Sequence, residues 1–501
     1  MMNRNALYML LNALVAAVVL VGYGVHPGTA HPVYVILLFA ICSAPIIEAR
    51  AVNGPYALLV LWSIDFFLMY GALDLRNLMF GVDGTPIESE GVLDTAETLI
   101  IVGGLLVQIT YRIACRAASR SAPNIVPKDW TELSLIVVGV TLWIVATRLC
   151  WEFSVNLFTE RSNAATLAGL QSLGGIKVGM FMVARMAQPL SILILAYAQC
   201  RYRRPYMVPL MVGVVVFQLI YGFIIDFKTE ALIGGVLVVL TNLLVYGRVP
   251  KFWVALMLVV LAVGFPILQA NRVVRDERAE NSTKASENVF EALQRALQAK
   301  ERTNTGRDRA QTALERLTTK TSVEIIVRGT GTITPFQHGY TLTPIITTFI
   351  PRLLWSDKPS IPTGQIMNKE FHISDATETY VSPSHLGELY WNFGWAGVVV
   401  GMSLIGLTFG AIGGRFNLAQ AATITRVLVI VVTVREVILA SEGEFATHYV
   451  VWMRSLLGIG LLHLVFARVP WGARSRTAAG RADSDDVPKP APTQPFPNIL
   501  R

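Results

Sequence analysis

Charged side chains are scarce in this 501-residue sequence. They make up 15% of the chain, and hydrophobic residues make up 53%, whereas a typical soluble domain carries about 25% charged residues. Repeated apolar runs of roughly 17–20 residues are long enough to cross a bilayer core of about 30 Å. The composition therefore excludes an ordinary soluble domain and predicts an all-α polytopic membrane protein.

Several catalytic and metal-binding motifs are also missing. The sequence has no Walker A loop, no G-x-S-x-G, no H-E-x-x-H and no D-x-D pair in the segments predicted to lie outside the membrane. ATP-driven transport and α/β-hydrolase chemistry are therefore unsupported. We expect no metal site and no other cofactor. Four cysteines lie within or at the ends of apolar runs without metal-ligand spacing, which predicts ordinary helix residues: Cys42, Cys115, Cys150 and Cys200.

The apolar runs predict about twelve transmembrane helices. The first run has no clear small-residue cleavage site, so we expect it to remain as a helix rather than to be removed as a signal peptide. The predicted helices cover residues 6–25, a second run ending near 47, 55–70, a fourth ending at 111, 133–150, a sixth ending near 198, 205–225, 231–246, a ninth ending near 270, 393–412, 421–440 and 448–466.

The basic residues set the predicted orientation. If every run crosses the bilayer, five basic clusters fall on one side, which should be the cytoplasmic side. Both termini are then cytoplasmic, and the formal net charge of +8 reflects this face rather than nucleic-acid binding. The clusters are Arg112/Arg116/Arg120, Arg201/Arg203/Arg204, Arg248/Lys251, Arg415 and Arg468/Arg474/Arg476.

This topology divides the chain into four parts. We expect transmembrane helices 1–9 with short outer loops in residues 1–270, a large periplasmic loop in 271–392, helices 10–12 in 393–467 and a disordered cytoplasmic tail in 468–501. A loop of about 120 residues among short connections is usually functional. Residues 287–317 carry spaced apolar positions in a charged background, which predicts amphipathic helices or, alternatively, a solvated helical hairpin.

Ionisable residues gather near the predicted outer boundary of the membrane. Such charges are costly at depth and usually face a cavity or pair with one another. Pairing within Asp226–Lys228–Glu230 and of Arg435 with Glu436 or Glu444 is one interpretation, and a polar cleft open to the outside is the other. Arginine suits bidentate capture of phosphate oxygens, and the candidates for substrate binding are Arg272, Arg275, Arg328, Arg352, Arg435, Lys358, Tyr390, Asp226 and Lys228.

Two stretches of the late outer loop carry a resemblance. The sequences FIPRLLWSDKPSIP (349–362) and SPSHLGELYWNFGWAG (382–397) resemble the corresponding loop and following helix of bacterial oligosaccharide repeat-unit polymerases, the Wzy-type O-antigen and exopolysaccharide polymerases. The resemblance implies a multi-span fold of the GT-C-like polymerase and ligase architecture, with a large, partly helical outer loop between helices 9 and 10. It also implies location in the bacterial inner membrane.

The resemblance further implies a metal-independent glycosyltransferase that uses lipid carriers. The donor would be a glycan on undecaprenyl pyrophosphate, and the acceptor a hydroxyl of a second lipid-linked unit. A chain-length regulator and a flippase are the implied protein partners. Arginines would stabilise the leaving pyrophosphate, and a carboxylate or histidine would accept the hydroxyl proton. The candidates for that base are Glu388 and His385, followed by Asp357 and His338.

Other interpretations stay open at this point. Glu388 stands near a predicted helix start, where a carboxylate also stabilises the helix without any chemistry. An O-antigen ligase, a flippase or transporter of lipid-linked glycans, and a non-catalytic scaffold of an export complex are the alternatives for the whole chain. A flippase rarely needs so large an outer loop, and no inverted repeat is visible.

Overall fold

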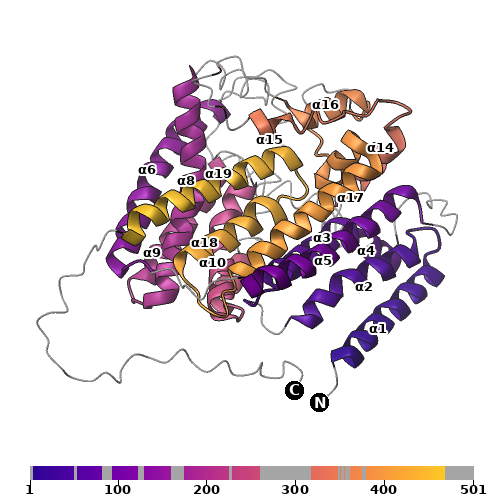
Figure 1. The fold of residues 1–501 in the computed structure, drawn as a ribbon, viewed down its shortest axis with the longest axis horizontal. Helices are drawn as coiled ribbons and strands as arrows, with labels where there is room; N and C mark the ends of the chain where they lie inside the picture. The colour runs from indigo at the N-terminus through magenta and orange to yellow at the C-terminus, as the bar shows by residue number, and fades with distance from the viewer. Residues whose placement is uncertain are drawn as a thin grey trace, which may run out of the picture.

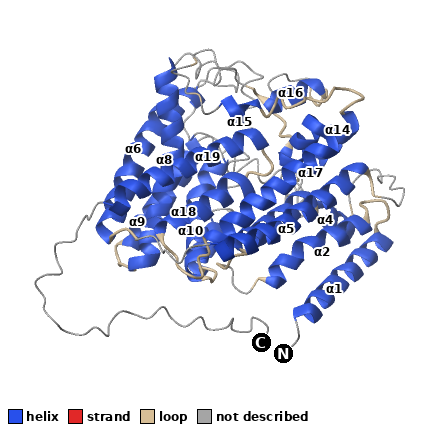
Figure 2. Ribbon diagram, in the orientation of Figure 1, coloured by secondary structure: helices blue, strands red, loops and turns tan. Residues whose placement is uncertain are grey.

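The computed structural model describes residues 4–49, 53–81, 93–121, 129–159, 174–224, 228–259, 318–347, 350, 355, 361–374 and 380–468. These residues are almost entirely helical and contain no strand, only one isolated bridge between Thr330 and Thr334 (Figure 2). The all-α prediction is therefore confirmed. The helices are α1 (Arg4–Val25), α2 (Pro32–Glu48), α3 (Ala57–Tyr70), α4 (Ala72–Phe80), α5 (Thr95–Ser121), α6 (Glu132–Thr159), α8 (Gly174–Tyr202), α9 (Met207–Ile224), α10 (Lys228–Tyr246), α14 (Lys320–Gly329), α15 (Thr343–Thr347), α16 (Thr363–Glu370), α17 (Ser384–Arg415), α18 (Ile424–Thr433), the π-helical turn η1 (Val434–Ile438) and α19 (Phe445–Arg468).

Fewer helices are long enough to cross a membrane than the sequence suggests. Within the described residues, five helices have the required length and composition, namely α1, α5, α6, α17 and α19. A sixth results if α3 and α4, which are bent by 50° at their junction, form one span. Apolar helices such as α2 contain 10–17 residues, less than the roughly 20 needed for a straight crossing. The predicted count of about twelve is therefore only partly matched.

The centre of the bundle is the contact between α5 and α17, which lies between α1 at one edge and α6 and α9 at the other (Figure 1). Glycines on one stripe of α17 make this contact close. A Cβ added at Gly410 would lie 2.3 Å from the carbonyl oxygen of Tyr111, and one at Gly406 or Gly414 would lie 2.5 Å from a carbonyl of α5. Small residues at such positions let two membrane helices approach backbone to backbone.

The short connections and the basic clusters share one end of this bundle. Asn53 accepts a hydrogen bond from the Ala419 amide (3.0 Å) and lies against Gly247, so three connections meet there. The end of α5 reaches the end of α17, where Ser119 Oγ lies 3.5 Å from the Gly414 carbonyl oxygen. The described basic residues at this end are Arg112, Arg116, Arg120, Arg201, Arg203, Arg204, Arg248, Lys251 and Arg415.

The described part of the long loop lies at the other end. Helices α14, α15 and α16 gather at the top of Figure 1, whereas α1 begins at the bottom. The Thr319 amide, just before α14, donates to the Met69 carbonyl near the end of α3 (3.1 Å). The loop is thus partly helical, as predicted. The amphipathic helices predicted for residues 287–317 lie outside the described residues.

Helix α17 begins nine residues before the predicted start of the tenth span and is broken inside. Phe393 has a non-helical backbone, and Gly394 has a φ of 59°, a conformation that suits glycine. The break separates a short half-helix, residues 384–392, from the long half that packs on α5. A Cβ at Gly397 would lie 2.2 Å from the Leu389 carbonyl oxygen, so the half-helix turns sharply back against the long half.

Candidate functional site

The half-helix of α17 meets the connection between η1 and α19. The Phe445 amide, at the first position of α19, donates to Glu388 Oε2 (2.6 Å). The His385 amide donates to the Ser441 carbonyl oxygen (3.0 Å). The first amides of a helix have no partner within it, so residues 441–445 complete the start of α17 while they hold its carboxylate. We take this junction as the candidate site.

Glu388 is fully buried and only half satisfied. Its side chain has 0% exposure, and Oε1 makes no hydrogen bond of normal geometry with any described residue. Its backbone carbonyl accepts from the Asn392 amide group (2.8 Å), which also donates to Thr341 Oγ1 (2.7 Å). The Thr341 hydroxyl and the Ala446 amide also act on this carboxylate, so its second oxygen is enclosed by polar groups rather than open to solvent.

His385 lies three residues earlier, on the same side of the half-helix. Its ring is 5% exposed and packs edge-on to Phe445, with ring centroids 5.6 Å apart. The rings of His448 and Tyr449 complete the surroundings at 6.1 and 6.0 Å. Nε2 has no hydrogen-bond partner among the described residues. The site therefore holds a second titratable side chain, buried and with no hydrogen-bond partner on its Nε2 among the described residues.

Glu444 connects the long loop between α10 and α17 to the same junction. Its Oε1 accepts from the Gly364 amide (3.1 Å) and from the Tyr380 hydroxyl, while Oε2 accepts from Thr447 Oγ1 (2.5 Å). Tyr380 is 47% exposed as a whole residue, but burial of its hydroxyl end, together with the neighbouring Glu444 charge, raises the pKa of the phenol. The phenol therefore stays protonated and donates its hydrogen bond throughout the physiological range.

Arg435 forms an ion pair with Glu436 on η1, one of the two pairings that the sequence predicts. Its guanidinium also acts electrostatically on His448, whose ring lies next to His385. Single π-helical turns are frequent at functional sites because they redirect side chains. Three predicted site residues, Glu388, His385 and Arg435, thus surround the start of α19.

Three other predicted residues have their described contacts elsewhere. Arg328 is exposed at the end of α14 and lies 3.6 Å from Asp94. Tyr390 is half-buried beside Phe336, with ring centroids 6.3 Å apart. His338 is exposed, and its amide donates to the Asn392 carbonyl oxygen at the break of α17 (3.1 Å). The structure places none of these three at the Glu388 carboxylate.

The remaining predicted site residues cannot be placed against this junction. Lys228 belongs to α10, but its side chain is not described. The others lie outside the described residues: Asp226, Arg272, Arg275, Arg352, Asp357 and Lys358.

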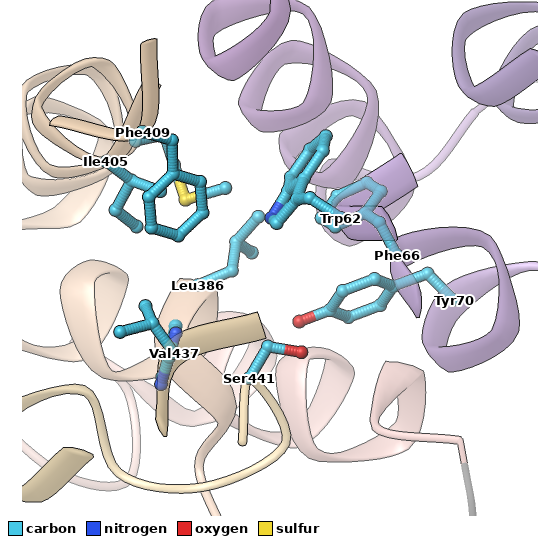
Figure 3. A pocket seen from close by; sticks show the side chains of 10 residues that line it. Trp62, Phe66, Tyr70, Leu386, Ile405, Phe409, Val437 and Ser441 are labelled. Atoms are coloured by element: carbon cyan, nitrogen blue, oxygen red, sulfur yellow. The ribbon is translucent and has the colours of Figure 1, made fainter. Parts of the chain in front are cut away.

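A narrow cavity adjoins the junction and reveals a residue that sequence reasoning missed (Figure 3). Its polar lining includes His385 and Ser441, and Ser441 Oγ donates to Asp65 Oδ2 on α3 (2.7 Å). Asp65 is the one acidic residue in the apolar run ALLVLWSIDFFLMY of α3, and an isolated charge in such a run is itself a signal of function. The remaining lining residues are Trp62, Phe66, Tyr70, Leu386, Met402, Ile405, Phe409 and Val437.

A second charged group joins the loop to the bundle. Lys320, the first residue of α14, lies 2.6 Å from Asp74 Oδ2 and 2.8 Å from Glu97 Oε1, and His31 contacts the other oxygen of Glu97. All four side chains are largely buried, and the Lys320 ammonium sits over the Tyr34 ring at 4.3 Å. This network fixes α14 beside α2, α4 and α5.

Within the part of the chain that the structure describes, no three His, Cys, Asp or Glu side chains are arranged to hold a metal ion. The four cysteines are buried, and none forms a disulfide bond.

A comparison with protein families gives one match to report. A family model described as "Domain of unknown function (DUF8712)" matches residues 158–422, which is more than half of the chain. This region runs from the end of α6 to just before α18 and includes Glu388 and His385. No curated protein matches the chain, and no solved structure does either.

Proposed function

We propose that this chain, which belongs to the family described as Domain of unknown function (DUF8712), joins lipid-linked oligosaccharide units at the outer face of the bacterial inner membrane. The reaction is glycosyl transfer from an undecaprenyl pyrophosphate donor to a sugar hydroxyl of a second lipid-linked unit. The observation that carries the proposal is the buried Glu388 carboxylate, half satisfied by the Phe445 amide, at the outer-loop end of a membrane helix.

In this proposal, the acceptor hydroxyl oxygen bonds to the anomeric carbon of the donor while the bond from that carbon to the pyrophosphate oxygen breaks. The hydroxyl proton passes to Glu388, and undecaprenyl pyrophosphate leaves. Such general base assistance typically contributes a factor of about 100–10,000 in rate. His385 lies on the same face of the half-helix as Glu388, and its ring contacts His448, on which Arg435 acts electrostatically.

The proposed placement follows from the two ends of the bundle. The end with the basic clusters faces the cytoplasm, in line with the positive-inside rule, so the Glu388 junction faces outward. The six spans above and α8 give seven crossings. Twelve result if five more segments also cross: α2, α9, α10, α18 with η1, and the run near residues 250–270. Both termini are then cytoplasmic.

Metal independence is part of the proposal, because arginine side chains supply the positive charge for the leaving pyrophosphate. Polymerisation by purified protein, with lipid-linked oligosaccharides extracted from a deletion strain as substrate, should keep its rate in EDTA. Loss of the rate in EDTA and its return with a divalent cation would contradict this part alone.

The deciding experiment is the fate of lipid-linked glycans after deletion of the gene. A missing polymerase leaves single translocated units on the outer face, a missing ligase leaves long polymer on the lipid carrier, and a missing flippase leaves units inside. We expect the first pattern, reproduced by Glu388→Gln in protein that is expressed and inserted normally. Thr147→Val is the matched control, since it removes a buried hydrogen bond to Gln188 (3.1 Å) far from α17.

Polymer of normal length in the deletion strain would overturn the proposal. Normal polymer from Glu388→Gln alone would instead remove Glu388 from the reaction.

A further inference from the structure

The connection between η1 and α19 supports both groups of the candidate site at once. Ser441, at its start, accepts from the His385 amide, and Phe445, at its end, donates to Glu388. The geometry of the two proton-carrying groups therefore depends on the position of residues 441–445. Two carboxylates hold these five residues in place: Asp65 on α3, which accepts from Ser441, and Glu444 within the connection itself, which accepts from Gly364.

The two anchors differ in what they hold. Glu444 binds residues of the outer loop and the first turn of α19. Asp65 comes from a different helix, is 6% exposed and accepts a hydrogen bond from the Ser441 hydroxyl. It lies in an apolar helix of the bundle, where a carboxylate is costly to keep. No basic side chain pairs with it among the described residues.

We propose that Asp65 is a positioning residue for the Glu388–His385 site and acts through Ser441. The Asp65 carboxylate accepts from the Ser441 hydroxyl, and the Ser441 carbonyl accepts from the His385 amide. Four residues after Ser441, the Phe445 amide donates to Glu388. The packing of α3 against η1 and α17 brings these groups together around the narrow cavity. Asp65 itself touches no reacting atom in this arrangement.

If Asp65 acts through Ser441, variants of the two residues should show a characteristic pattern. Asp65→Ala and Ser441→Ala each remove one side of the same hydrogen bond, so the double variant should be no worse than either single variant. Asp65→Asn keeps a side-chain oxygen that accepts from Ser441 and should restore most of the wild-type behaviour. If the negative charge of Asp65 were what mattered, Asp65→Asn would fail as badly as Asp65→Ala.

The geometric test does not depend on any activity. Purified full-length protein is treated with diethyl pyrocarbonate, and the labelling of each histidine is read by peptide mass spectrometry. His385 is buried in the wild type, so Asp65→Ala and Ser441→Ala should raise its labelling several-fold, whereas Asp65→Asn should not. His463, which contacts Thr425 at the other end of α19 (2.8 Å), is the internal reference and should not change.

The rate effect rests on the proposed function. With extracted lipid-linked oligosaccharides, Asp65→Ala should lower the polymerisation rate about 10- to 100-fold, the range expected when a hydrogen bond to a charged group is lost, and Thr147→Val should not. Unchanged His385 labelling in Asp65→Ala, or equal defects in Asp65→Asn and Asp65→Ala, would overturn the inference. If the deletion strain makes normal polymer, the proposed function fails, yet the labelling result still decides whether Asp65 positions His385.

Discussion

The Phe445 amide donates to Glu388 Oε2 at 2.6 Å although the two residues are 57 positions apart in the sequence. The donor is a backbone group at the start of α19, and the acceptor is a side chain on the half-helix of α17. Helix N-terminal amides stabilise negative charge, so the start of α19 offsets part of the cost of burying the Glu388 carboxylate.

The first prediction concerns this bond. Proline is favoured at the first position of a helix and has no N–H, so Phe445→Pro should keep α19 while it removes the donor to Glu388. We expect the polymerisation rate at neutral pH to fall about 10- to 100-fold, since a hydrogen bond to a charged group contributes about 1.5–3 kcal/mol. Phe445→Leu is the control, because it loses the ring but retains the N–H. Rates that fall equally in the two variants would show that the Phe445 ring, not its amide, is required.

The second prediction concerns Arg352, which lies outside the described residues but follows an apolar run in the loop. If it binds the leaving pyrophosphate of the proposed reaction, it should contribute a factor of about 100–1,000 in rate. Arg352→Ala should therefore shorten the polysaccharide drastically on a gel, with membrane expression as control. Arg352→Lys should rescue poorly, because an ammonium cannot form the bidentate fork. Full rescue by lysine would show that the site requires a positive charge at this position but not the bidentate geometry of arginine.

The third prediction concerns Lys320. Lys320→Met leaves Asp74 and Glu97 buried without their cation, which should lower the free energy of unfolding by about 3–5 kcal/mol. Thermal unfolding of the detergent-solubilised protein measures this change. A variant as stable as the wild type would mean that water reaches the two carboxylates.

The same group gives a pH dependence. Burial alone would lower the pKa of the Lys320 ammonium, but Asp74 and Glu97 raise it above its ordinary value. Because the folded-state pKa is the higher one, the stabilisation is fully present below an unfolded-state pKa of about 10.4 and is lost as pH rises toward the folded-state pKa. The stability difference between the wild type and Lys320→Met should thus stay constant from pH 7 to about pH 10 and shrink above it.

The fourth prediction concerns the contact of α17 with α5. Gly410→Ala places a methyl group 2.3 Å from the Tyr111 carbonyl oxygen, so the two helices must move apart. Overpacking of this kind typically costs about 1–3 kcal/mol. The matched control is Gly458→Ala on α19, where a Cβ meets nothing within 4 Å and helix propensity favours alanine. Thermal unfolding should therefore rank Gly410→Ala clearly below Gly458→Ala.

The fifth prediction concerns orientation. Thr332 lies after α14 and Arg248 after α10, and both are exposed. In intact cells, a membrane-impermeant thiol reagent should label Thr332→Cys and not Arg248→Cys. The four native cysteines are buried, so the background should be low. Labelling of Arg248→Cys from outside would invert the proposed topology.

Sequence patterns identify what is local in this protein. Composition and run length give the helical membrane class, and the three-residue spacing of His385 and Glu388 predicts that both lie on one helix face. The ion pair of Arg435 with Glu436 involves neighbours in sequence, so it could also be predicted. Each of these relationships lies within a single element.

The parts that sequence patterns miss depend on distant partners. Asp65 and Ser441 are 376 positions apart, and Lys320 and Asp74 are 246 apart, so no spacing rule connects them. The break of α17 is hidden for a different reason. Gly394 stands in an otherwise apolar run. Only its positive φ distinguishes it from an ordinary helix glycine, together with the preceding carbonyls that accept hydrogen bonds from another segment.

The break in α17 determines which part of the protein Glu388 moves with. The carbonyl oxygens of Trp391 and Asn392 and the Asn392 side-chain oxygen accept from the consecutive amides of Gln337, His338 and Gly339. These three amide protons should exchange with solvent at similar rates, and together with those of the half-helix, because opening one bond requires the others to open. Glu388 should then belong to the same cooperative unfolding unit as the loop segment 337–339, and the long half of α17 can keep its place in the bundle while that unit opens.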